Sequence, residues 1–134
     1  MNESNDRVYV RQLLSPQNVN LHGSVFGGDL YSLFDCAAYI ASKEIYPDYE
    51  FVTRSTESAF LAPLYPGDVV TIKGSLEHKP DSSAVKVSLV GEVDRLGRYE
   101  DKHHAPKDGV VARMSFVMVA VKREKGEFVK SPIP

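Results

Sequence analysis

The stretch that decides the fold is residues 18–45, which read NVNLHGSVFGGDLYSLFDCAAYIASKEI. Its second part repeats apolar side chains every three or four residues, the spacing of one face of an amphipathic helix. The pattern predicts a helix that starts at Gly27 or Gly28, continues to about Glu44 and ends before Pro47. The apolar positions are Leu30, Leu33, Phe34, Ala37, Ala38, Ala41 and Ile45.

The sequence outside this helix alternates apolar and polar residues, which is the period of a β-strand. The order is one short strand, the helix and then four strands, separated mainly by Pro, Gly and Asp turns. This order predicts an α+β fold over residues 1–134 as a single domain, with one long central helix wrapped by an antiparallel sheet of about five strands. We expect a long surface loop at 94–108 and a frayed tail after Arg123. The expected strands are 7–14, 51–61, 68–78, 83–93 and 110–122.

Composition excludes several classes of protein. The 134 residues carry a net charge of −2, so bulk charge gives no reason to expect nucleic acid or a membrane surface as a partner. The one cysteine, Cys36, cannot form an intrachain disulfide. The polar first residues and the lack of any apolar run of about 20 residues favour a cytoplasmic location. Motifs of zinc sites, P-loops and serine hydrolases are missing, so no metal is expected.

Two glycines, Gly27 and Gly28, stand at the expected start of the helix. The N–H groups of a first helical turn have no acceptor within the helix and can bind partial negative charge. Such an end can polarise a carbonyl and stabilise the oxyanion that forms when the carbonyl is attacked. A tight turn from loop to helix would explain the same two glycines equally well.

Asp35 lies in the middle of the predicted helix among apolar neighbours, where a carboxylate is costly unless it is paired or functional. It can act as a general base or as a nucleophile, although a solvated helix face is the alternative. Seven residues separate Gly28 from Asp35, so both lie on one helix face about 10 Å apart along its axis. Reacting groups must approach within about 3.5 Å, so a shared site would need Gly28 from one chain and Asp35 from another.

Two further features are open to two interpretations. Asn20 can bind a carbonyl or hold a water, but asparagines are also ordinary loop residues. Apolar side chains on a second face of the sheet favour a homodimer, unless the strands are buried on both faces within one chain. These side chains are Val69, Val90, Val117, Val119 and Val121.

The motif Asn18-x-Asn20-x-x-Gly23-x-Val25-Phe26-Gly27-Gly28-x-Leu30, followed by Asp35-x-Ala37-Ala38-x-Ile40-Ala41, resembles the signature of short hotdog-fold acyl-CoA thioesterases. The similarity continues through Val52-Thr53 and Phe60-Leu61-Ala62-Pro63 and covers nearly the whole chain. It implies hydrolysis of acyl-CoA to a free acid and CoA, with CoA as part of the substrate and no separate cofactor. It also implies homodimers with a continuous sheet, and hexamers built as trimers of dimers.

The resemblance assigns catalytic roles to individual residues. The family's catalytic carboxylate falls on Asp35, and its catalytic asparagine, supplied across the subunit interface, falls on Asn20. The helix start that polarises the thioester carbonyl falls on Gly27 and Gly28.

Other residues are candidates for binding the substrate. Phe26 and Ser24 precede the helix, although Ser24 stands where relatives often carry Asp or Asn. Because CoA carries phosphates, cations near the entrance are expected. The candidates by strand position are Arg54, Arg113 and Lys86, each of which also suits an ordinary solvated strand.

Two alternative functions stay open. A hotdog enoyl-thioester hydratase or dehydratase pairs a histidine with a carboxylate, and His22 with Asp35 could supply that pair, but the loop lacks the Pro-Gly pattern of those enzymes. A non-catalytic acyl-CoA-binding module is the other alternative, but such a module has no need of Asn20 and of a carboxylate near the thioester.

Overall fold

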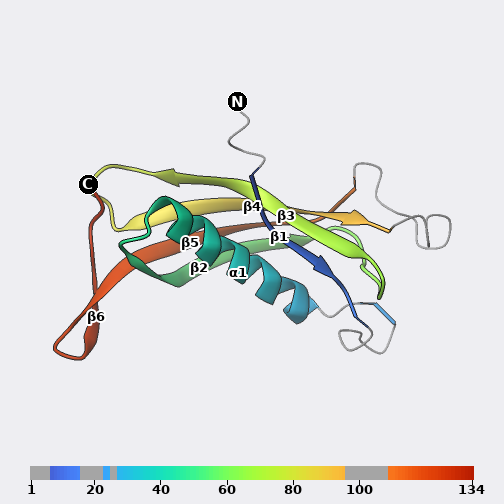
Figure 1. Cartoon of the computed structure of the whole chain (residues 1–134), viewed down its shortest axis with the longest axis horizontal. Coiled ribbons are helices and arrows are strands. Elements are labelled where there is room, and N and C mark those ends of the chain that lie inside the picture. Colours follow the sequence, from blue (N-terminus) through green and yellow to red (C-terminus); the bar gives the residue numbers. More distant parts are fainter. Residues whose placement is uncertain (1–6, 16–22, 25–26, 96–108) are drawn as a thin grey trace.

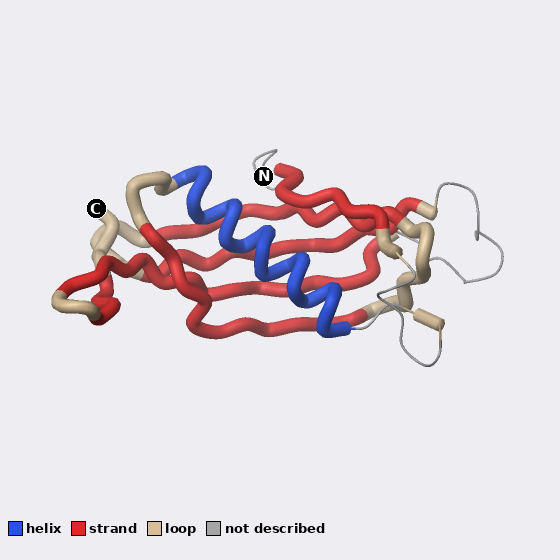
Figure 2. The backbone as a smooth tube through the Cα atoms, turned by 60° about the horizontal axis from the view of Figure 1, so that its bottom comes forward, coloured by secondary structure: helices blue, strands red, loops and turns tan. Residues whose placement is uncertain are grey.

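The computed structural model describes residues 7–15, 23–24, 27–95 and 109–134. Within these residues, one helix lies across one face of a six-stranded antiparallel sheet (Figures 1 and 2). The predicted helix and five predicted strands are confirmed, and their ends lie within two residues of the expected bounds. The elements are β1 (Arg7–Leu13), α1 (Gly27–Ile45), β2 (Glu50–Phe60), β3 (Val69–His78), β4 (Ala84–Asp94), β5 (Val110–Glu124) and β6 (Glu127–Lys130).

The strands follow the order β1-β3-β4-β5-β2, and β6 pairs with the end of β5. β3, β4 and β5 form an antiparallel meander, while the chain on either side of α1 supplies the two outer strands. β2 therefore pairs only with β5 and has a second, unpaired edge among the described residues. The side chains of β2 from Val52 to Phe60 are all exposed in the single chain.

The core lies between α1 and one face of the sheet. Phe34 is fully buried and packs directly against Gly91 of β4. A Cβ atom on Gly91 would lie only 2.7 Å from Cζ of Phe34, so a glycine is required for this close approach. Small helix residues lie beside it, and alternate strand residues fill the remaining space. Among them are Ala37, Ala38, Ala41, Val85, Val87, Leu89, Met114, Phe116 and Met118.

A β-bulge in β2 changes which side chains face the helix. Thr53 lies opposite Met118 and Ser55 lies opposite Val117, so Arg54 is an extra residue in the strand. Because a one-residue shift exchanges the two faces of a strand, the bulge keeps both Thr53 and Phe60 on the face that α1 covers. The opposite face of the sheet, which carries Ser88 and Ser115, is called the outer face below.

The expected fraying after Arg123 is wrong. β5 continues to Glu124, and β6 returns along it after a turn with Lys125 and Gly126 at positive φ. The chain then runs back to the β3–β4 turn, where the Ile133 carbonyl accepts a hydrogen bond from the Asp81 amide at 2.8 Å. Because Ile133 is also buried in the core, the tail is a packed part of the fold.

The valines of the second sheet face give less support to a dimer than the sequence suggested. Val69, Val119 and Val121 are each less than a tenth exposed in the single chain, whereas Val90 and Val117 are partly exposed. Burial on both faces within one chain therefore accounts for three of the five. A case for a dimer has to come from another part of the molecule.

The contact between Phe34 and Gly91 predicts a measurable coupling. Gly91→Ala should lower the free energy of unfolding by about 1–3 kcal/mol, because the added methyl group overlaps the Phe34 ring. Phe34→Leu removes the overlapping ring atoms, so the double variant should lose less stability than the sum of the two single changes. Urea unfolding of all four proteins measures this coupling, and strict additivity would contradict the packing described.

Candidate active site

The start of α1 has no packing reason to contain Gly28. A Cβ atom on Gly28 would meet no other part of the described residues within 4 Å, and Gly28 does not have a positive φ. The positive φ in this region, +80°, belongs to Gly23. A tight turn therefore accounts for Gly23 rather than for Gly28, and a side chain at Gly28 would occupy space that another group can enter.

The Asp35 carboxylate is partly buried and is held in one orientation by β2. Its Oδ1 accepts a hydrogen bond of 2.8 Å from the Thr53 hydroxyl, which also lies 3.3 Å from Sδ of Met118. A hydrogen bond to a charged acceptor is stronger than one between neutral groups. Asp35 is therefore a positioned carboxylate rather than part of a freely solvated helix face.

A groove of about 650 Å³ lies between α1 and β2 at Asp35. Apart from Asp35 and Thr53, its walls are mainly apolar. The Tyr39 hydroxyl in this wall donates a 2.5 Å hydrogen bond to Glu50, which raises the pKa of Tyr39 and lowers the pKa of Glu50. The other lining residues are Cys36, Ile40, Phe51, Val52 and Met118.

A second groove, of about 350 Å³, lies at the start of α1. Gly27 and Leu30 form its helix side, and the segment 60–64 forms the facing wall. Phe60 and Leu61 are more than half exposed, and the Phe60 ring lies 3.6 Å from the position of a Cβ atom on Gly27. Apolar surface thus lies directly beside the helix end that can bind partial negative charge.

One chain does not bring the two halves of the site together. α1 is an unbroken helix from Gly27 to Ile45, so the axial rise of about 10 Å between Gly28 and Asp35 applies. The two grooves also lie at different positions along β2, one beside Thr53 and the other beside Phe60. Both grooves border the strand that has an unpaired edge.

Several predicted site residues fall where the structure gives no description. Asn18, Asn20, His22 and Phe26 lie outside the described residues, so their roles stay predictions. Ser24 is described, and it is partly buried in the bend that follows Gly23.

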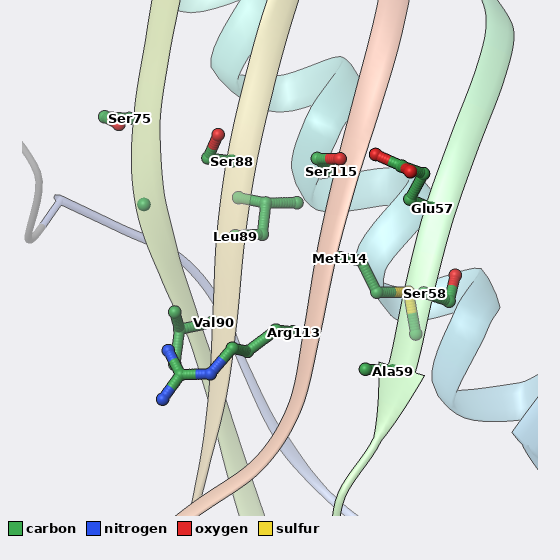
Figure 3. Close-up of a pocket in the computed structure, with 11 residues that line it drawn as sticks. Glu57, Ser58, Ala59, Ser75, Ser88, Leu89, Val90, Arg113, Met114 and Ser115 are labelled. Carbon is green, nitrogen blue, oxygen red and sulfur yellow. The ribbon is translucent and has the colours of Figure 1, made fainter.

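The predicted phosphate-binding cations lie away from Asp35 within the same chain. Arg113 borders an outer-face cavity of about 580 Å³, where its side chain reaches toward Val90 (Figure 3). Arg54 and Lys86 border a different cavity, of about 610 Å³. Figure 3 also shows a row of polar side chains across the four strands, consisting of Ser75, Ser88, Ser115 and Glu57.

Sequence reasoning missed the partner of Asp35 and the wall of the second groove. In the sequence, Thr53 stands out only as part of the family motif, because its orientation relative to Phe60 depends on the bulge. Among the described residues, no cluster of His, Cys, Asp and Glu could hold a metal ion. The one helix found in these residues lacks the run of apolar side chains needed to span a membrane.

Comparisons with known proteins identify similar chains. A family model described as the thioesterase superfamily matches residues 22–90, just over half of the chain. No curated protein gives a significant match. HI0827, a hexameric broad-specificity acyl-coenzyme A thioesterase, is 27% identical with a TM-score of 0.76, covering 99% of this chain and 84% of its own.

Two other solved structures are similar. A hexameric thioesterase from Yersinia pestis is 26% identical with a TM-score of 0.74, over 94% of this chain and 95% of its own. A hexameric hotdog-fold thioesterase from Campylobacter jejuni is 21% identical with a TM-score of 0.76, over 99% and 93% of the two chains. The shared architecture confirms the predicted hotdog fold.

Proposed function

The chain belongs to the thioesterase superfamily, and we propose that it hydrolyses acyl-CoA to a free carboxylic acid and CoA. The observation that carries the proposal is the Asp35 carboxylate, which is fixed by Thr53 in a groove beside an unpaired strand edge. The acyl-CoA thioesterase HI0827, at 27% identity over nearly the whole chain, supports the substrate class. The reaction as proposed needs no cofactor, since CoA is part of the substrate, and we expect it to take place in the cytoplasm.

In the proposed mechanism, the N–H groups at Gly27 and Gly28 polarise the thioester carbonyl. Asp35 either removes a proton from an attacking water or attacks the carbonyl carbon itself, forming an anhydride that water then cleaves. The carbon–sulfur bond breaks in either route, and the CoA sulfur leaves and takes up a proton. Asn20 is proposed to hold the water or the carbonyl oxygen through its amide.

The proposed active unit is a homodimer formed through β2. Along this strand, Asp35 lies beside Thr53 and the helix start lies beside Phe60. Two copies of β2 related by a two-fold axis run in opposite directions, so the helix start of one chain comes toward Asp35 of the other. This pairing also satisfies the exposed N–H and C=O groups of the free edge.

We further propose that these dimers assemble into a hexamer as a trimer of dimers. HI0827 and the thioesterase from Yersinia pestis are both hexameric, which supports this assembly. None of Arg54, Arg113 and Lys86 lines the Asp35 groove of its own chain, so we propose that they bind the phosphates of a CoA held by a neighbouring subunit of the hexamer.

Asp35→Asn tests the central assignment. The change should lower kcat/KM for acyl-CoA by about 100- to 10,000-fold, because an amide can neither accept the proton nor attack the carbonyl. CoA release from a panel of acyl-CoAs, followed with a thiol reagent, measures the effect.

Glu44→Gln is the matched control, because Glu44 is an exposed carboxylate on the same helix that pairs with Arg7 at the surface. It should keep wild-type activity. Equal activity in Asp35→Asn and wild type would refute the role of Asp35. Hydration of an enoyl-CoA without release of CoA would favour the hydratase alternative, and tight binding without turnover would favour a binding module.

Thr53→Val should weaken catalysis by leaving the carboxylate without its fixed partner. A hydrogen bond to a charged group contributes about 1.5–3 kcal/mol, so kcat should fall by about 10- to 100-fold. Thr53→Ser keeps the hydroxyl and should stay within about threefold of wild type. Equal rates for the valine and serine variants would show that this hydrogen bond does not assist the reaction.

A mixing experiment tests the shared site. Asn20→Ala and Asp35→Ala chains should each be inactive, but each mixed dimer should contain one intact site. Random refolding should therefore restore about a quarter of wild-type activity in a two-fold symmetric dimer. Mixing Asp35→Ala with Asp35→Asn restores no intact site and serves as the control. Failure to recover activity after proven exchange of subunits would contradict the shared site.

A further inference from the structure

A buried ion pair lies behind the groove at the start of α1. Asp68 has no exposed surface and Arg95 is only 6% exposed, and Nε of Arg95 lies 3.5 Å from Oδ2 of Asp68. Removing two charges from water is costly, and apolar residues often replace such a pair without loss of stability. Stability alone is therefore a weak explanation for placing both charges here.

The pair holds the middle of the segment between β2 and β3. Arg95 donates a hydrogen bond of 3.0 Å from Nη2 to the Pro63 carbonyl, and Oδ2 of Asp68 accepts one of 2.9 Å from the Tyr65 amide. Both contacts fall on the irregular part of the chain, where no strand partner fixes the backbone.

The two ends of this segment are fixed in another way. The amides of Leu61 and Ala62 both donate to the Val111 carbonyl of the neighbouring strand, at 2.8 and 3.2 Å. At the other end, the Gly67 amide donates to the Leu14 carbonyl at 2.9 Å. Between these anchors, the Pro63 carbonyl and the Tyr65 amide are held by the side chains of Arg95 and Asp68.

The segment fixed in this way is one wall of a candidate binding groove. Pro63 and Leu64 line the 350 Å³ groove opposite Gly27 and Leu30, and Leu64 is buried in the core. A carbonyl bound at the helix start would direct its substituent along this apolar surface. A shift of the Pro63–Leu64 backbone would therefore change the space open to such a substituent.

We propose that the Asp68–Arg95 pair is a positioning device that sets the size of the acyl group accepted at the helix start. Arg95 and Asp68 touch no substrate and act through the backbone of Pro63 and Tyr65. The inference rests on the proposed thioesterase function and adds to it the residues that select the acyl chain. Loosening the wall should admit longer chains.

The test compares kcat/KM for butyryl-CoA and decanoyl-CoA. In Arg95→Met, which keeps most of the side-chain length but loses both contacts, the decanoyl-to-butyryl ratio should rise at least tenfold. Arg95→Lys keeps a charge near Asp68 but lacks the fork that reaches both partners, so its ratio should fall between those of wild type and Arg95→Met. If Arg95→Met fails to fold, the double variant Asp68→Asn with Arg95→Met removes the uncompensated buried carboxylate and should show the same shift.

Val85→Ala is the matched control for a loss of stability without a change in the wall. Val85 is fully buried near His78, at the end of the sheet away from this groove, so its truncation should lower Tm and leave the ratio unchanged. Hydrogen exchange gives a readout that does not depend on activity. The amides of Leu64 and Tyr65 should exchange at least tenfold faster in Arg95→Met than in Val85→Ala.

Each outcome bears on a different claim. A folded Arg95→Met protein with a ratio within twofold of wild type would overturn the proposal. If Tyr39→Ala then changes the decanoyl-to-butyryl ratio, the acyl group lies in the Asp35 groove instead of the groove at the helix start. A wild-type protein that hydrolyses no acyl-CoA would refute the proposed function and the acyl assignment together, and exchange rates would still measure whether the pair holds the wall.

Discussion

The close contact between Phe34 and Gly91 is the constraint on which the rest of the structure depends. A Cβ atom at position 91 would overlap the buried Phe34 ring, so this contact limits how closely α1 packs on β4 and favours the rotation that points Phe34 at Gly91. Each helical residue turns about 100° from the one before it. With Phe34 fixed against β4, Asp35 is turned away from the middle of the sheet toward β2, where Thr53 binds it. Packing in the core thus determines the direction of the carboxylate.

The same packing leaves the two candidate catalytic features of α1, its start and Asp35, at different positions along β2. A straight helix keeps the glycine end and Asp35 about two turns apart, and no rearrangement of side chains can close that distance. The sheet order leaves β2 with an unpaired edge beside both. The proposal of a partner subunit therefore rests on helix geometry and strand order, since three of the five outer-face valines are already covered within the chain.

The sequence predicted most of the fold because periodicity reports which side chains face a core. It was less informative wherever the outcome depends on a tertiary contact. The bulge at Arg54 reverses the alternation within β2, so the orientation of Thr53 could not be derived from spacing. In the sequence, Ile133 lies near the end of a tail expected to be polar and frayed, whereas in the structure it packs into the core. Asp68 starts an expected strand after a Pro-Gly turn and Arg95 lies in the expected surface loop, so the spacing does not indicate that together they form the buried pair.

Three structural roles fall on the single strand β2. It orients Asp35 through Thr53, it leads into the wall at Phe60 and Leu61, and it offers the edge on which a second copy can pair. β2 is an edge strand of eleven residues, all exposed except Phe51, and such an edge is a liability for a monomer, because its unpaired N–H and C=O groups favour uncontrolled pairing. In the proposed dimer, the pairing that covers this edge also brings the helix start of one chain toward Asp35 of the other. In this arrangement, assembly and catalysis depend on the same backbone.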